Sequence, residues 1–167
     1  MGRLTGARAL MEAVSWDGLK TNAGNATDVP SRLFRLFEAA DVTEAESAYW
    51  QLDNHIIVQG RMYWSAVASI PTLGAALLSQ NLSPPALHGV IDLLTEIALG
   101  HGHEREKEPD EITHEARVEL SRMLYGFYAL AGNSDDRVRR CVIDILEVLE
   151  PEEPRWTRLD DVYRRGG

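Results

Sequence analysis

Apolar residues recur at intervals of three and four along most of this 167-residue chain. In the segment 134–149, for example, Val138, Val142, Ile145 and Leu149 fall on one face of a helix. No segment alternates apolar and polar residues with a period of two beside a turn pair such as Asn-Gly. The pattern therefore predicts an all-α protein.

The predicted helices come in pairs that are separated by short breaks. Their expected ranges are 31–40 with 43–58, 63–80 with 84–99, and 111–131 with 134–149. A short helix at 7–14 precedes them, and a Gly- and Asn-rich loop follows it. The pairs repeat near the ~40–47 residues of HEAT and armadillo units, and stacked hairpins explain them better than a four-helix bundle. We expect a short α-solenoid in one domain, 1–150, with a capping turn or flexible tail at 151–167.

Residues with capping chemistry mark the expected helix ends. The predicted N-caps are Asp28, Thr43, Ser83 and Ser134. Thr43 and Glu46 fit a capping box, in which each side chain accepts a hydrogen bond from the other residue's amide. Gly60 and Gly100 are expected to end the helices that precede them.

The chain is acidic, with a formal net charge of −9 and an isoelectric point near 5.0. Such a surface repels the phosphates of nucleic acids and attracts basic proteins. No run approaches the ~20 apolar residues of a membrane span. Cys141 is the one cysteine, which excludes an internal disulfide and suits a reducing compartment. We therefore expect a cytoplasmic protein with a basic protein partner and with no membrane or nucleic-acid partner.

One stretch, "YWQLDNHIIVQGRMYWSAVASIPTLGAALL" at 49–78, resembles a known family. The positions that carry the resemblance are His55, Gln59, Gly60, Ala66, Ala68, Pro71, Leu73 and Leu77. They are similar to bacterial HEAT-like proteins, in which a helix ends in His/Gln-Gly and the next runs through alanines to a proline and leucines. The resemblance implies a small α-solenoid. Some such proteins are encoded beside toxins as immunity proteins, and the family implies no catalytic residues.

The residues around the break between the helices 43–58 and 63–80 are the predicted partner-binding residues. They are Trp50, Asp53, His55, Gln59, Tyr63 and Trp64. Tryptophan and tyrosine are common anchors of protein interfaces, although aromatic residues here also suit the core. The two residues His55 and Gln59 share a helix face, where they either contact a partner or satisfy backbone carbonyls. Carboxylates expected to attract the partner are Glu44, Glu46, Glu104, Glu106 and Glu108.

A second cluster lies in "LGHGHEREKEPDEITHEA" at 99–116, which holds His101, His103 and His114 among carboxylates. Imidazoles and carboxylates are zinc ligands, but the spacing matches no strong metal-binding signature. We interpret this stretch as a solvated connection between helices, so no cofactor is expected and the three histidines are only weak metal candidates.

These observations favour a non-enzymatic, HEAT-like protein-binding module, such as an immunity or inhibitor protein that binds a basic partner. Two alternatives stay open. One is a metal-dependent hydrolase that uses His101, His103 and His114. The other is a nucleic-acid-processing HEAT-like protein, for which the basic run Arg137, Arg139 and Arg140 would contact phosphates.

Overall fold

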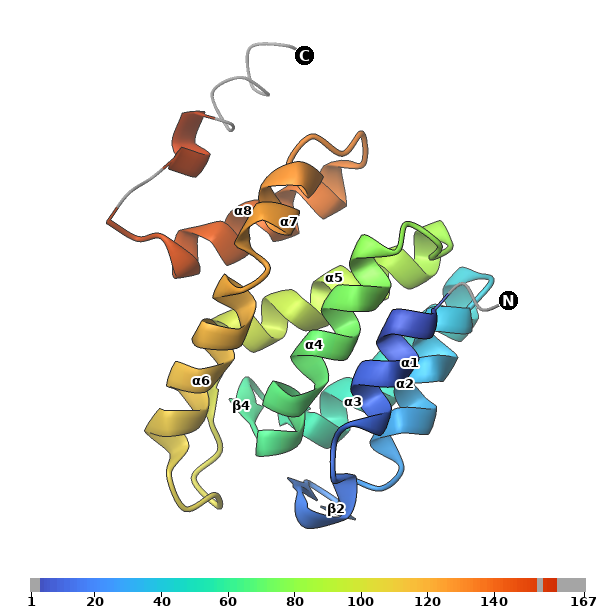
Figure 1. The fold of residues 1–167 in the computed structure, drawn as a ribbon, viewed down its shortest axis with the longest axis vertical. Helices are drawn as coiled ribbons and strands as arrows, with labels where there is room; N and C mark the ends of the chain where they lie inside the picture. The colour runs from blue at the N-terminus through green and yellow to red at the C-terminus, as the bar shows by residue number, and fades with distance from the viewer. Residues whose placement is uncertain (1–3, 153–154, 159–167) are drawn as a thin grey trace.

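The computed structural model describes residues 4–152 and 155–158, and these residues are mostly helical (Figure 1). This confirms the all-α prediction at the level of fold class. The helices are α1 (Thr5–Glu12), the 3-10 turn η1 (Trp16–Gly18), α2 (Val29–Glu38), α3 (Val42–Ile56), α4 (Trp64–Leu78), α5 (Pro84–Leu99), α6 (Pro109–Ser121), α7 (Leu124–Leu130) and α8 (Asp136–Leu149). Within the predicted tail, 155–158 form a helical turn, and the remainder from 159 lies outside the described residues.

The predicted single helix at 111–131 is wrong, because the structure divides it into α6 and α7. Met123 has φ −101° and ψ 7°, outside the helical range, and it separates the two helices. The division lets the two pieces pack on different neighbours, since α6 lies against α4 and α7 lies against α8. One straight helix would not serve both contacts.

Short strands, which the sequence did not predict, join the helices. The strands are β1 (Lys20–Thr21), β2 (Gly24–Asn25), β3 (Ile57–Val58), β4 (Arg61–Met62) and β5 (His101–Gly102). The turn between β3 and β4 is Gln59-Gly60, with positive φ at both residues (52° and 74°). That is the backbone of a two-residue hairpin turn, which Asn-Gly usually forms. β5 then pairs in parallel with β4.

Aspartates, more than hydroxyl residues, cap the described helices. Ser83 caps α5 as predicted, because its Oγ accepts from the Ala86 amide at 3.2 Å. The prediction that Thr43 caps α3 is wrong, because the side chain of Asp41, two residues earlier, accepts a hydrogen bond from the Glu44 amide at 2.9 Å. The prediction that Ser134 caps α8 is also wrong, because the cap is Asp135, whose carboxylate accepts hydrogen bonds from two amides of the first turn of α8. In both cases the carboxylate brings negative charge to a helix N-terminus, where it is stabilised.

Asp28 stands at the predicted N-cap position of α2, but its side chain forms no capping hydrogen bond. Its carboxylate instead accepts from Arg32 Nε at 2.9 Å and lies 2.8 Å from Nε2 of the buried His55. This network joins the start of α2 to the end of α3.

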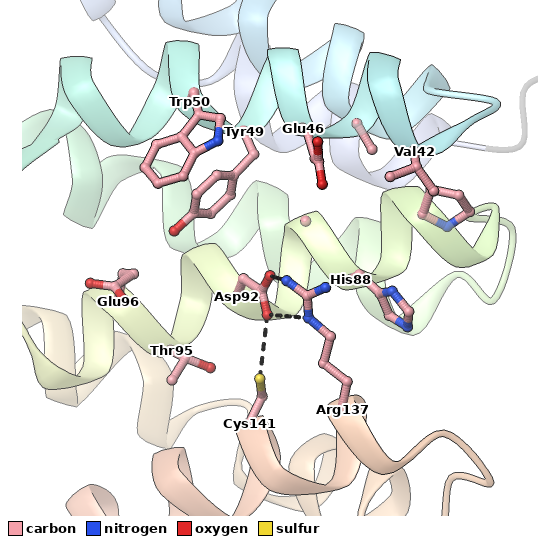
Figure 2. Close-up of a pocket in the computed structure, with 13 residues that line it drawn as sticks. Val42, Glu46, Tyr49, Trp50, His88, Asp92, Thr95, Glu96, Arg137 and Cys141 are labelled. Atoms are coloured by element: carbon pink, nitrogen blue, oxygen red, sulfur yellow. Dashed lines mark hydrogen bonds and ion pairs between the residues drawn. The ribbon is translucent and has the colours of Figure 1, made fainter.

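Helix α5 lies in the middle of the molecule and contacts α2, α3, α4, α6 and α8. Its fully covered side chains are Ala86, Val90, Ile91, Leu93, Leu94, Ile97 and Ala98. Helices α3 and α8 contact α5 from opposite sides (Figure 2), and all three run in the same direction. The start of α5 is held beside that of α3 because Ser83 Oγ donates to the Ala39 carbonyl at 2.6 Å.

The approach of β5 to the start of α6 generates a stability prediction. A Cβ atom added at Gly102 would lie 1.9 Å from the Pro109 carbonyl oxygen, so the backbone itself must move. We expect Gly102→Ala to lower the free energy of unfolding by about 2 to 3 kcal/mol in chemical denaturation. Gly18→Ala is the control, because a Cβ there meets nothing within 4 Å. Equal stability of the two variants would contradict this packing.

Candidate groove between helices α3, α5 and α8

An open groove of about 480 Å³ runs between helices α3, α5 and α8 (Figure 2). On α3 it is lined by Val42, Ala45, Glu46, Tyr49 and Trp50, and on α5 by Pro85, His88, Gly89, Asp92, Thr95 and Glu96. Arg137 and Cys141 reach it from α8. The spacings of three and four on both helices show that one face of α3 and one face of α5 line the groove.

Two large apolar side chains are exposed on the α3 side of this groove. Val42 is 60% exposed and Trp50 is 57% exposed. The ring of Trp50 meets that of Tyr49 edge to face, with centroids 5.2 Å apart. A single exposed apolar residue is ordinary on a protein surface. Here two of them lie on one wall of the same groove, about two helical turns apart.

The groove is negatively charged, since Glu46, Asp92 and Glu96 line it against the single arginine, Arg137. Arg137 Nε donates to Asp92 Oδ1 at 3.3 Å, and its Nη2 pairs with Oδ2 of the same carboxylate. This bidentate ion pair joins α8 to α5 (Figure 2). Cys141 Sγ donates to Asp92 Oδ1 at 3.4 Å, and burial raises the pKa of the thiol to about 11, so it is protonated at neutral pH.

Beyond Asp92, the carboxylates of Glu96 and Asp53 pair with no cation among the residues that the structure describes. Burial raises the pKa of Glu96, and the neighbouring Asp53 and Asp92 raise it further. Burial likewise raises the pKa of Asp53. The pKa of Tyr49 is raised by burial and by these two carboxylates. This end of the groove is therefore an uncompensated negative site beside two aromatic rings.

A histidine–carboxylate pair holds the opposite end of the groove together. His88 Nε2 on α5 lies 2.6 Å from Asp135 Oδ2 at the N-cap of α8. The hydrogen bond from His88 lowers the pKa of Asp135, and the amides of Val138 and Arg137 act in the same direction against the effect of burial. Asp135 thus stabilises α8 twice, as its cap and as its link to α5.

The structure separates the six predicted partner-binding residues. Trp50 lies in the groove, and Asp53 lies one turn beyond it on α3. Gln59 is exposed at the turn between β3 and β4, away from the groove lining. Trp64 is half-buried at the start of α4, where its amide donates to Glu106 Oε1 at 3.4 Å.

The other two predicted contacts, His55 and Tyr63, are buried, with 5% and 2% of their surfaces exposed. His55 pairs with Asp28, and Tyr63 stacks on His103 with centroids 4.5 Å apart and planes at 24°. Their side chains are engaged inside the protein and do not reach its surface. The sequence did not indicate Asp92, Glu96 or Cys141 as groove residues, because each resembles an ordinary residue of a helix, and it indicated Arg137 only as a phosphate contact.

The carboxylates predicted to attract the partner lie in different parts of the structure. Glu46 alone lies in the groove. Glu44 accepts from the Ala40 amide at 2.9 Å at the start of α3, and Glu106 forms an ion pair with Lys20 at 3.8 Å. Glu104 lines a separate depression of about 460 Å³ beside α6.

The three histidines of 99–116 are not brought together as one site. His101 and His114 line the depression beside α6, whereas His103 is buried against Tyr63 and its Nδ1 accepts from the Arg105 amide at 3.1 Å. Across 4–152 and 155–158, no group of three or more His, Cys, Asp and Glu is placed to hold a metal ion. The stretch connects α5 to α6 as interpreted, but β5 anchors its start to the hairpin.

Two further groups of polar residues are engaged within the protein. Ser65 Oγ on α4 donates to the Lys20 carbonyl at 2.7 Å, and His55 pairs with Asp28. In the basic run, Arg137 pairs with Asp92 and Arg139 with Asp136. Internal carboxylates therefore neutralise two of the three arginines.

Comparisons with protein families, with curated proteins and with solved structures find no match to this chain. Among the helices in the described ranges, none is long and apolar enough to cross a membrane. The groove is therefore interpreted from its own geometry and chemistry.

The His88–Asp135 pair generates a prediction about pH. A carboxyl whose folded pKa is lowered stabilises the protein above its ordinary value of 3.8, and this stabilisation is lost as the pH falls below it. We expect Asp135→Asn to be less stable than the unchanged chain at neutral pH. The difference should narrow as the pH falls below about 4, as measured by denaturation midpoints. Asp17→Asn, at an exposed carboxyl in η1, is the control, and a constant difference at Asp135 would contradict the pairing.

Proposed function

We propose that this chain is a protein-binding module without catalytic activity, and that its partner docks on the groove between α3, α5 and α8. One observation carries the proposal: the indole of Trp50 is 57% exposed on the wall of an open groove that also exposes Val42. Covering tryptophan by a partner yields much of the energy of many interfaces. The groove beside Trp50 and Val42 therefore suits an apolar side chain of a partner.

The charge of the chain supports a basic partner. The whole protein carries a net charge of −9, and within it the groove holds three carboxylates against one guanidinium. Opposite charge on the partner would speed the encounter and orient it, while the apolar contacts at Trp50 would slow dissociation. Nucleic acid is disfavoured because its phosphates would meet this negative surface.

The arrangement of helices supports the HEAT-like solenoid as the architecture of this module. In each successive unit, an earlier helix is followed by one of α3, α5 and α8, and these three lie side by side in the same direction. Parallel second helices are what stacked helix hairpins produce, and the surface of such a stack commonly binds proteins. We favour an inhibitor or immunity protein in the cytoplasm, which neutralises a basic protein by covering part of its surface.

The test is affinity capture from cells that naturally produce the chain, with quantitative mass spectrometry and then calorimetry on the captured partner. We expect Trp50→Ala to weaken binding by about tenfold or more, because the indole is the apolar anchor. Tyr125→Ala is the control, since Tyr125 is 84% exposed on α7 and does not line the groove. If Trp50→Ala binds the partner as tightly as the control does, the proposal is wrong.

A further inference from the structure

The shape of the groove indicates what kind of segment it accepts. Its floor on α5 extends from Pro85 to Glu96, a length of about 16 Å at the rise of an α-helix. That length corresponds to about three turns of a second helix lying along the groove. The walls are the parallel helices α3 and α8, with Tyr49 and Trp50 on one side and Arg137 and Cys141 on the other (Figure 2). A helix seated there would interdigitate with their side chains in the ordinary way.

The two ends of the groove differ in chemistry. Near the starts of α3 and α5 the apolar Val42, Ala45 and Pro85 lie beside Glu46 and His88. Toward the ends of these helices lie Glu96 and the adjacent Asp53, neither of them paired with a cation in the described chain. An occupant of the groove would therefore be apolar on one face and would carry a charged side chain where it meets Glu96 and Asp53.

A covering partner would remove water from Glu96 and Asp53, which is costly for a carboxylate that gains no opposite charge. An apolar or acidic occupant would leave that cost in place. A lysine or arginine would offset it, and the rings of Tyr49 and Trp50 offer an aromatic surface to the same cation. Charge complementarity thus selects a basic occupant over the alternatives.

We propose that the groove receives an amphipathic helix of the partner, whose apolar face covers Val42 and Trp50 and whose lysine or arginine pairs with Glu96 and Asp53. This inference rests on the proposed function and specifies the occupant of the same groove. Arg137 then acts as an internal competitor, because its guanidinium already pairs with Asp92, the carboxylate next along α5.

The test uses two synthetic helical peptides of about three turns. One segregates leucines and lysines to opposite faces, and the other carries glutamate in place of every lysine. The readout is the indole N–H signal of Trp50 in a nitrogen–proton correlation spectrum, which Trp50→Phe assigns among the four tryptophans. We expect the lysine peptide to shift this signal saturably, and the glutamate peptide to leave it unchanged.

Variants of the charged groups test the cation site itself. We expect Glu96→Gln to weaken binding of the lysine peptide about fivefold, and Arg137→Met to strengthen it about threefold by freeing Asp92. Glu12→Gln on α1 is the matched control, because it removes the same charge at an exposed position outside the groove. Thermal unfolding of each variant establishes that it is folded.

The outcomes separate this inference from the proposed function. Equal shifts of the Trp50 signal by both peptides, or equal weakening by Glu96→Gln and Glu12→Gln, would overturn the cation site. If neither peptide moves the signal, the helical occupant is wrong. Loss of the captured partner in Trp50→Ala would still support the groove as its docking surface in each of these cases.

Discussion

The burial of helix α5 is the constraint on which the rest of the structure depends. Its apolar side chains face five neighbouring helices, and truncating any one of the large ones would leave a cavity that costs about 2 to 5 kcal/mol. One face of α5 stays partly exposed. It contains Pro85, His88, Asp92 and Glu96, and it is the floor of the groove. The helix that organises the core therefore also holds the walls of the candidate site in place, because α3 and α8 are both positioned by packing against it.

Ion pairs and hydrogen bonds between α3, α5 and α8 add to this apolar packing. Ion pairs from Asp92 and Asp135 join α5 to the first turns of α8, and the hydrogen bond from Ser83 to the Ala39 carbonyl aligns α5 with α3. Such partly exposed links contribute little to stability each. Their value is geometric, since they keep the three helices in register, while Glu96 forms no ion pair with any cation in the described part of the chain. Apolar burial supplies most of the stability, and the charged groups fix how the three helices lie against one another.

The helical pattern predicted the fold class because one apolar face per helix is a strong periodic signal. The helix ends were harder to predict, because Asp41 and Asp135 have the same capping chemistry as the nearby Thr43 and Ser134, and the sequence does not decide between them. Trp50 was predicted as a contact because tryptophan is a common interface anchor, and the structure places it on the wall of the groove. The remainder of the groove comes from α5 and α8, whose charged residues resemble any solvated face until the helices are assembled.

Hydrogen–deuterium exchange of the chain with and without its captured partner tests the groove as the docking surface most directly. If the partner docks in the groove, exchange slows on binding in 42–53, 85–96 and 137–141, where the three helices line the groove. Side-chain cover alone slows exchange in a helix when the partner suppresses its local opening. Protection confined to α7, or to the connection 101–108, with these three segments unchanged, would contradict it.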